Sequence, residues 1–387
     1  MARIIVFGDS SVNTLGLIRS LGEKGVPVLL MLGRSGRDSC YVRFSKYIDR
    51  IYWLDNIEDV ISFFCGDLNA DYGKSIVLCS GDRFMSLIDA HYEELQDKIF
   101  VFNAQGKSGR INLFMDKSRQ LPVARKCGLD IIKTWKIDDI DNVPDDITYP
   151  CIIKGNNSLY GGKDDLFVCQ SRSELLSRLN QGNLFLVQEY IDKEFELDIV
   201  GFSYNHGKNV FIPAVVRKIR ETLTRQSDYI CLEDIRKHPM LNVDGIKALV
   251  QEIGYEGIFS VEFVVRNNRY YFLEINLRND GVGYLYSAAG INYPYLWVLY
   301  NTGRLTDDFL KSITFKTPYY LMSEGDLFNV FAGKVSIVQW LKECFGVDAH
   351  FRLNIHDMMP FIYSSYIHFK NKILRLFSCV QRCMHRG

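Results

Sequence analysis

The pattern of apolar and polar positions first predicts an open α/β region at the N-terminus. Residues 3–7 (RIIVF) form a short run of β-branched and aromatic side chains, followed by the turn GDSSVNTLG, the helical pattern LGLIRSLGEKG and the apolar run VPVLLML. Strand, helix and strand in this order predict parallel pairing. The pattern returns where Ser75–Cys79 (SIVLC) precedes SGDRFMSLIDAHYEEL. We therefore expect residues 1–110 to form a parallel sheet surrounded by helices.

After residue 110 the pattern changes to an α+β type with mostly antiparallel strands. A helical segment, NLFMDKSRQLPVARKCG, ends at a glycine and leads through a Pro/Asp-rich linker to the apolar runs CIIK, LFVC, FLVQEYI, FELDIVGFSY and NVFIPAVVRK. A helix is predicted over about 243–253, and two further strands flank Asn267–Asn268. After the first 110 residues we expect a small subdomain over 111–192, a large one over 193–305 and a C-terminal extension over 306–387.

Composition excludes several classes of protein. Lys plus Arg and Asp plus Glu each number 46, so the whole chain offers no electrostatic argument for a nucleic-acid partner. No apolar run reaches the roughly 18–20 residues that span a bilayer, and the start lacks the layout of a signal peptide. The ten cysteines lack CxxC spacing, which favours reduced thiols in a cytosolic enzyme. GDSSVNTLG lacks the glycine triplet of a dinucleotide-binding loop, so NAD is not expected.

The strongest chemical signal lies in the segment FSVEFVVRNNRYYFLEINLRNDG. A two-residue turn at Asn267–Asn268 would put Glu262 and Glu274 on opposite faces, because one residue of slip reverses every side chain. A three-residue loop over 267–269 would pair them, and asparagine tolerates the left-handed conformation that such a loop needs. We expect the three-residue loop, with Asn276 on the same face as both acids.

Two carboxylates directly opposite each other are destabilising unless a cation lies between them. Glu262, Glu274 and Asn276 would supply three oxygen donors, a set that suits Mg²⁺ when phosphate oxygens and water complete it. Arg278, two residues further on, could neutralise a transferring phosphoryl group or orient a carboxylate. The alternative is a surface hairpin with both acids in water, although both acids have apolar neighbours.

Three other segments offer groups for a nucleotide, and each also has an ordinary structural explanation. Lys154 ends an apolar strand before the glycine-bearing loop GNNSLYGGKDD, which would let the backbone approach a phosphate or would simply be a hairpin tip. The strand FLVQEYI ends in backbone groups that could pair with a purine edge, and Glu196 beyond it could accept ribose hydroxyls. Arg217 and Lys218 alternate along a strand, so at most one of them should face a site.

Lys117, Lys154 with its glycine loop, the QEYI hinge with Glu196, and the strands VEF…LEINLR occur in one order. This order resembles the ATP-grasp superfamily of carboxylate–amine (or thiol) ligases over about residues 1–300, and EINLR is its most specific part. The resemblance implies an open parallel-sheet (pre-ATP-grasp) domain followed by two α+β subdomains that grip ATP. Its expected cofactors are ATP and Mg²⁺, with Mn²⁺ as an alternative metal.

The resemblance also implies roles for individual residues. Phosphate contacts are expected from Lys117 and Lys154, loop closure around Gly161 and Gly162, adenine contacts from Gln188, Glu189, Tyr190 and Ile191, further nucleotide contacts from Glu196, Arg217 and Lys218, metal ligation by Glu262, Glu274 and Asn276, and transition-state stabilisation by Arg278. One departure is Gly155, which stands where the family often has proline after the second lysine.

The activity implied by the resemblance is an ADP-forming ligase that converts a carboxylate into an acyl-phosphate and joins it to an amine. The segment EINLRNDGVGYLYSAAGINYPYL looks like D-aspartate ligase and its relatives, which suggests an amino-acid ligase acting on a cell-envelope or peptidoglycan precursor. The alternatives are a ligase or carboxylase of a nucleotide-precursor pathway and a non-catalytic ATP-sensing module. Small-molecule substrates and a cytoplasmic location are expected.

The last segment, 361–387, contains no acidic residue and five Lys/Arg, with apolar residues at near-helical spacing. A basic amphipathic helix of this kind could rest on an anionic membrane at the inner face. The alternative is a helix packed on its own protein or on the partner of a homodimer.

Overall fold

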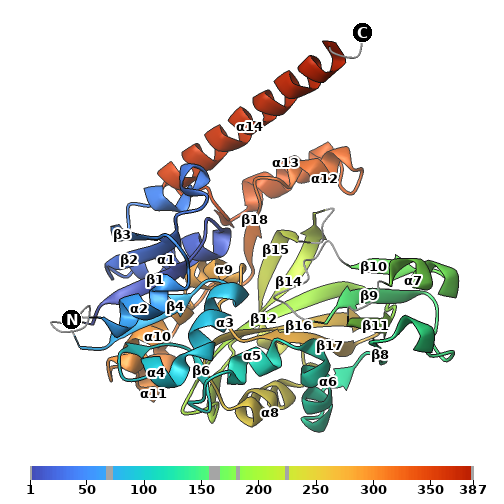
Figure 1. Cartoon of the computed structure of the whole chain (residues 1–387), viewed down its shortest axis with the longest axis horizontal. Helices are drawn as coiled ribbons and strands as arrows, with labels where there is room; N and C mark the ends of the chain where they lie inside the picture. The colour runs from blue at the N-terminus through green and yellow to red at the C-terminus, as the bar shows by residue number, and fades with distance from the viewer. Residues whose placement is uncertain (1, 67–72, 157–165, 180–183, 223–225, 385–387) are drawn as a thin grey trace.

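The computed structural model describes residues 2–66, 73–156, 166–179, 184–222 and 226–384, with side chains as far as residue 371. Three sheets organise this part of the chain (Figure 1). Gly161 and Gly162 lie outside the described residues, so the predicted loop over the phosphates is not part of the description.

The first sheet is parallel, as the N-terminal pattern predicts, with the strand order β3-β2-β1-β4-β5. Its strands are β1 (Ile4–Gly8), β2 (Val28–Gly33), β3 (Ile48–Leu54), β4 (Ser75–Cys79) and β5 (Ile99–Phe100). The helices between them are α1 (Val12–Gly22), α2 (Asp59–Cys65), α3 (Asp82–Ala90) and α4 (Tyr92–Leu95). Every residue of β1 and β4 is buried, which is why both strands are continuous apolar runs.

The second sheet is small and antiparallel, with the order β10-β9-β11-β8. It comprises β8 (Thr134–Ile137), β9 (Cys151–Gly155), β10 (Phe167–Cys169) and β11 (Phe185–Glu189), with the helix α7 (Arg172–Arg178). Trp135, Ile153, Leu175 and Val187 belong to a hydrophobic cluster that is separate from the main core. All four strands fall within 111–192, the predicted small subdomain.

The third sheet is large and follows the order β19-β18-β15-β14-β12-β16-β17-β7. Its strands are β7 (Asp130–Ile131), β12 (Phe195–Tyr204), β14 (Ala214–Glu221), β15 (Ser227–Asp234), β16 (Tyr255–Arg266), β17 (Arg269–Asn276), β18 (Tyr319–Met322) and β19 (Ala349–His350), with β6 (Asn103–Ala104) on β16 and β13 (Asn209–Phe211) on β12. The predicted small subdomain and C-terminal extension therefore both supply strands to this sheet.

The helices of this half are α5 (Arg110–Phe114), α6 (Lys117–Lys126), α8 (Val243–Ile253), α9 (Gly283–Ala289), α10 (Tyr293–Asn301), α11 (Asp307–Ser312), α12 (Leu327–Phe331), α13 (Ile337–Gly346) and α14 (Met359–Met384). The predicted helix over 243–253 is confirmed as α8. The segment predicted as one helix around Lys117 forms two, because Asp116 has an extended conformation and its side chain accepts a hydrogen bond from the Ser118 N–H.

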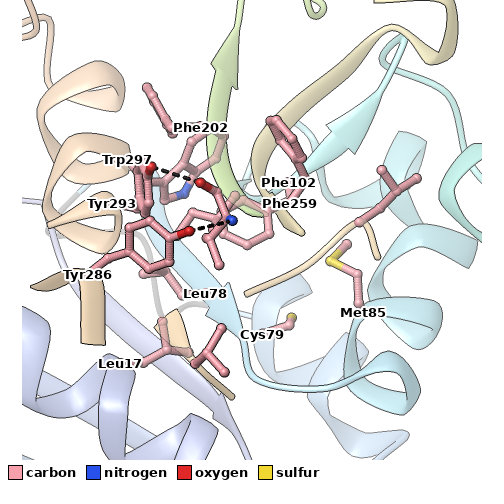
Figure 2. Close-up of a cluster of buried hydrophobic side chains, with 14 of the residues drawn as sticks. Leu17, Leu78, Cys79, Met85, Phe102, Phe202, Phe259, Tyr286, Tyr293 and Trp297 are labelled. Carbon is pink, nitrogen blue, oxygen red and sulfur yellow. Dashed lines mark hydrogen bonds between the residues drawn. The ribbon is translucent and has the colours of Figure 1, made fainter. Parts of the chain in front are cut away.

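Aromatic side chains join the parallel sheet to the large one in a buried cluster (Figure 2). The Tyr293 hydroxyl donates to the Val200 carbonyl at 2.8 Å, and the Val200 N–H donates to the Tyr286 hydroxyl at 3.0 Å. These bonds fix α9 and α10 against β12, while Leu78 of β4 and Leu17 of α1 extend the same core to the parallel sheet and its first helix. The parallel sheet and the large sheet thus meet through a buried, hydrogen-bonded contact.

The eight cysteines with described side chains form no disulfides, as expected for reduced thiols. Across the described residues, none of the helices combines the length and apolar character needed to cross a bilayer.

Candidate active site

The β16–β17 hairpin places the two predicted acids opposite each other, but by a different route from the one expected. Asn267 and Asn268 both have positive φ (50° and 59°) and form a two-residue turn that pairs Arg266 with Arg269. Such a turn requires positive φ at both positions, which asparagine tolerates. The three-residue loop predicted over 267–269 is therefore wrong.

A β-bulge restores the pairing that this turn alone would have prevented. Phe263 still pairs with Phe272, but Glu262 pairs with Glu274, so Leu273 is an extra residue in β17. A bulge of this kind shifts the register by one and returns the following side chains to the other face. Glu262 and Glu274 consequently share a face, and Ser260 pairs with Asn276 two residues further along.

Glu262, Glu274 and Asn276 line a cavity of about 260 Å³ between the small sheet and the large one. Apolar side chains line it from both sheets, with Ile152 from the small sheet and Val264 and Leu273 from the large one, and Ile132 adds to them from the segment between β7 and β8. The bulged residue therefore has a place in the site, because its side chain forms part of the wall beside Glu274. A pocket that combines apolar walls with a few charged groups is typical of a small-molecule site.

Lys117 pairs with Glu274 at 2.5 Å between Nζ and Oε2. It is the first residue of α6, and its N–H donates to the carbonyl of Asn156, just beyond β9. Burial alone would lower the pKa of the Lys117 ammonium, but the attraction of Glu274, Glu262 and Asp82 outweighs it and raises the pKa. The solvated role that a helix-start lysine often has does not apply here.

A second lysine, Lys218, lies beside Glu262. The Lys218 ammonium, whose side chain is 3% exposed, lies 3.0 Å from Glu196, 3.2 Å from Asp198 and 3.5 Å from Glu262. Glu196 also pairs with Lys193 at 2.6 Å. Burial would raise the pKa of Glu196, but the two lysines hold it well below its usual range.

The alternation predicted for β14 is confirmed, and it removes one candidate from the site. Lys218 faces the acids of the cavity, whereas the neighbouring Arg217 lies on the opposite face and pairs with Glu233 at 3.1 Å. Arg217 as a nucleotide contact is therefore not supported by its position.

Arg278 lines the cavity and forms two bonds with Asp82, at 2.7 Å from Nε and 2.9 Å from Nη2. The two residues are 196 positions apart, and Asp82 begins α3 in the N-terminal region. Burial opposes the charge of Arg278, but Asp82 more than compensates and raises its pKa. Asp82 was missed by sequence reasoning; the available signal is its position directly after a parallel strand, where polar groups often meet ligands.

Lys154 differs from the other cations of the cavity. It lies on β9, where it lines the cavity from the small sheet, and none of the described carboxylates is within ion-pair distance of it. Burial, with the nearby charge of Lys117 as a second cause, lowers its pKa from the usual 10.5 to about 8. A lysine with this environment has a strong electrostatic preference for an anionic ligand.

The end of β11, which was predicted to contact adenine, lines the cavity only in part, and some of its backbone donors are already used. Gln188, Glu189 and Ile191 line the cavity, but Tyr190 is 37% exposed and does not. The N–H groups of Glu189 and Tyr190 already donate to the carbonyls of Lys133 and Pro150. The Gln188 amide donates to Thr134 at 2.9 Å.

The donor set fits Mg²⁺. The Asn276 amide nitrogen donates to Ser260 at 3.4 Å, which leaves its carbonyl oxygen as the atom able to join the carboxylates of Glu262 and Glu274. In the described part of the chain no three His, Cys, Asp or Glu side chains form a complete metal centre. Two carboxylates and one amide oxygen would therefore need phosphate oxygens and water, which is the way Mg²⁺ usually binds beside nucleotides.

A second cavity of about 320 Å³ adjoins the first at the carboxyl ends of β1, β2 and β4. Asp9, Ser39 and Arg83 line it, and it shares Asp82 with the first cavity. Open parallel sheets commonly bind ligands at this edge.

Comparison with known proteins agrees with this geometry. Residues 117–290 match the model of the ATP-grasp domain. Formate-dependent phosphoribosylglycinamide formyltransferase of Prochlorococcus marinus (strain MIT 9312) is 25% identical over 209 residues, which cover 49% of this chain and 51% of that protein. The chain thus spans about half the length of this curated relative.

Two solved structures share the fold. N5-carboxyaminoimidazole synthetase from Staphylococcus aureus has a TM-score of 0.63 at 14% identity, with 86% of each chain covered. L-amino acid ligase from Bacillus licheniformis has a TM-score of 0.59 at 13% identity, covering 76% of this chain and 73% of the ligase. The predicted fold class is therefore confirmed: the chain has the ATP-grasp fold, with an ATP-grasp domain over residues 117–290 preceded by a parallel sheet.

Proposed function

We propose that the protein is an ATP- and Mg²⁺-dependent ligase that activates a carboxylate as an acyl-phosphate and joins it to an amine, releasing ADP and phosphate. The observation that carries the proposal is the opposed pair Glu262 and Glu274, in one cavity with Lys154, which forms no ion pair with a described carboxylate. Cofactor use agrees with a similar structure, in which N5-carboxyaminoimidazole synthetase is complexed with ADP.

The residues of the chain divide the work of phosphoryl transfer. Glu262, Glu274 and Asn276 would hold Mg²⁺, which supplies charge neutralisation at the phosphates when bound. Lys154 binds phosphate oxygens from the small sheet, and Lys117 binds them from the start of α6. Glu196, which lines the cavity, accepts the ribose hydroxyls, and the apolar walls hold the adenine. Positioning and charge neutralisation are the main contributions a protein makes to this chemistry.

The reaction transfers the γ-phosphoryl group to a carboxylate oxygen and leaves ADP. The amine nitrogen then attacks the activated carbonyl carbon, phosphate leaves with the former carboxylate oxygen, and the nitrogen loses a proton. Arg278, held by Asp82 where the two cavities meet, stabilises the charge on the transferring phosphoryl group. Enclosure between the two sheets limits hydrolysis of the intermediate.

The second cavity supports an amino acid as one substrate. Asp9 and Arg83 provide opposite charges in this cavity, which match the ammonium and carboxylate groups of an amino acid. The fold shared with an L-amino acid ligase supports this choice. Action on a cell-envelope or peptidoglycan precursor remains a prediction. A D-aspartate-like specificity remains a prediction, as do a cytoplasmic location and a homodimer.

The second candidate function is a ligase of a purine-type pathway. It is favoured by the names of the curated relative, a phosphoribosylglycinamide formyltransferase, and of the solved N5-carboxyaminoimidazole synthetase. In this case the second cavity would accept a phosphoribosyl substrate, and Arg83 would face its phosphate.

An assay of ADP release distinguishes these functions. The full chain is incubated with ATP and Mg²⁺, with each amino acid alone and in pairs, and with phosphoribosyl amines plus formate or bicarbonate. We expect amino-acid-dependent ADP release with an amide product found by mass spectrometry. Release that requires a phosphoribosyl amine would support the purine-type function, and ATP binding without any substrate-dependent release would support the sensing module.

A further inference from the structure

In the part of the chain that the structure describes, most of the large exposed apolar side chains belong to one stretch of the sequence. Thirteen of the seventeen in the described chain lie between residues 327 and 369. They are Leu327, Phe328, Phe331, Ile337, Val338, Leu341, Phe345, Ile355, Met358, Met359, Ile362, Tyr366 and Phe369, which we call the apolar surface. Scattered exposed apolar residues are normal on soluble proteins, but a concentration of this kind marks an interaction site.

Helix α13 shows that this exposure follows a helical pattern. Ile337, Leu341 and Phe345 are spaced by four residues and therefore lie along one side of the helix, with Val338 beside them. This side is exposed, and Phe345 is 90% exposed. The opposite side contacts the protein through Glu343, which pairs with Arg220 at 2.7 Å. The helix thus turns its apolar side outward, the reverse of an ordinary surface helix.

The exposed charged side chains described between residues 324 and 371 that lie free of ion pairs are positive. Residues 324–387 contain five acids and eight lysines and arginines. Each acid is at most 17% exposed and pairs with a base: Glu324 with Arg352, Asp326 and Glu343 with Arg220, Asp348 with Lys316, and Asp357 with Arg19. The region therefore presents positive charge beside its apolar side chains, with Lys334, Lys342 and Lys370 all exposed.

The first turns of α14 are fastened to the body of the protein. The Tyr363 hydroxyl donates to the carbonyl of Asp38 at 2.6 Å, and the Tyr363 ring packs on Phe44 with the rings 4.3 Å apart. From this base the helix extends away from the body on the same side as α12 and α13 (Figure 1). Ile362, Tyr366 and Phe369, at spacings of four and three, form an exposed apolar stripe along the described turns.

We propose that α12, α13 and α14 form a docking surface for the headgroup region of an anionic lipid bilayer. Aromatic and aliphatic side chains would enter the boundary between headgroups and acyl chains, while the lysines contact lipid phosphates. Peripheral binding of this kind needs no membrane-spanning helix, in agreement with the described helices. It would keep the catalytic cavity beside substrates held at a membrane.

A second copy of the chain is the other occupant to weigh. Joining two identical surfaces would bring the exposed lysines of both copies together without an exposed acid from residues 324–387 to neutralise them. Anionic lipids remove this repulsion, so the distribution of charge favours the bilayer.

The test is co-sedimentation of the full chain with vesicles of phosphatidylglycerol and phosphatidylcholine in equal parts, and with phosphatidylcholine alone. We expect binding to the anionic vesicles that weakens with added salt, and little binding to the neutral ones. The double variant F331D/F345D should reduce binding at least about tenfold, because both side chains are exposed and would otherwise enter the bilayer.

Met240→Asp is the matched control, because Met240 is 67% exposed but lies outside the apolar surface. It should bind vesicles like the wild type, and all variants should keep the wild-type melting temperature and nucleotide affinity. Absence of binding to anionic vesicles, or an equal loss in Met240→Asp, would overturn the proposal. So would a dimer in sedimentation velocity that F331D/F345D dissociates, since a second copy would then cover the surface.

Discussion

The two walls of the catalytic cavity differ in how their charges are balanced. On the side of the large sheet and α6, Glu274 pairs with Lys117, Glu262 lies beside Lys218, and Arg278 is held by Asp82. On the side of the small sheet, Lys154 has no such partner among the described carboxylates, and its pKa is lowered to about 8. The charges of the first wall are paired without a ligand, whereas burial on the second wall disfavours the charged form of Lys154.

The difference in charge pairing between the two walls shows how a site can be stable without a ligand and still favour binding of an anionic nucleotide. Burying a charge without a partner is costly, so a protein can keep few such groups. Here the cost is concentrated at Lys154, on a four-stranded sheet with its own hydrophobic cluster. Binding of a triphosphate would compensate this charge, which links nucleotide binding to the stability of the small sheet.

The largest effect is expected for Glu274→Gln, which removes a metal ligand and the partner of Lys117. Turnover should fall at least about 100-fold, because Mg²⁺ would lose one of two carboxylates. Steady-state ADP release at varied Mg²⁺ measures this. Glu233→Gln is the matched control on the opposite face of the same sheet, and it should keep near-normal turnover. Near-normal rates in Glu274→Gln would contradict the metal assignment.

Arg278→Lys tests the contact between the N-terminal region and the site. Lysine keeps the charge but cannot form both bonds to Asp82, so we expect kcat to fall roughly 30-fold with a smaller change in ATP affinity. Stopped assays for kcat and calorimetry for ATP separate the two quantities. If ATP affinity falls as much as kcat, Arg278 acts in binding rather than in phosphoryl transfer.

Lys154→Met tests the unbalanced wall directly. Removal of this buried charge should weaken ATP binding about tenfold and, without nucleotide, raise the melting temperature. Lys136→Met is the control, because Lys136 is an exposed lysine in the same row of the small sheet but outside this cavity. Calorimetry and thermal unfolding supply both readings. A Lys154→Met protein with unchanged ATP affinity would remove this residue from the site.

The lowered pKa of Lys154 predicts a dependence on pH. The folded protein loses this proton near pH 8, whereas the unfolded chain keeps it up to about 10.5, so the destabilising charge is fully present below pH 8 and is relieved above it. ATP should stabilise the charged form, which means that binding near pH 8 takes up a proton and weakens about threefold over the next pH unit. Calorimetry in buffers of different ionisation enthalpy measures the uptake, and Lys154→Met should abolish it.

The smallest effect is expected for Arg217→Ala. Because its side chain pairs with Glu233 on the far face of β14, ATP affinity should change less than about twofold. Equilibrium binding of a fluorescent ATP analogue is sufficient to measure this. A tenfold loss would show that Arg217 reaches the nucleotide after all, and that the two faces of this strand are not separate.

Local patterns predicted much of the fold. The parallel N-terminal sheet, the helix over 243–253 and the alternation of Arg217 and Lys218 follow from apolar periodicity and from the two-residue repeat of a strand. The break before Lys117 could also have been found, since Asp116 is a preferred residue for starting a helix.

Other features depend on contacts that sequence reasoning could not supply. Glu262 faces Glu274 through a bulge at Leu273, and a bulge is set by packing against neighbouring strands rather than by a turn signal. The Arg278–Asp82 contact joins residues 196 positions apart. Arg278 follows β17 of the large sheet, whereas Asp82 follows β4 of the parallel sheet. No local pattern assigns β7, β18 and β19 to the large sheet, because each is a short strand that depends on its neighbours.

The most direct test of the account is a crystal structure of the protein grown with ADP and Mn²⁺, with an anomalous difference map at the manganese edge. The account predicts a metal peak in contact with oxygens of Glu262, Glu274 and Asn276, and Lys154 on a phosphate oxygen. A nucleotide in the cavity whose metal contacts none of these three residues would contradict it.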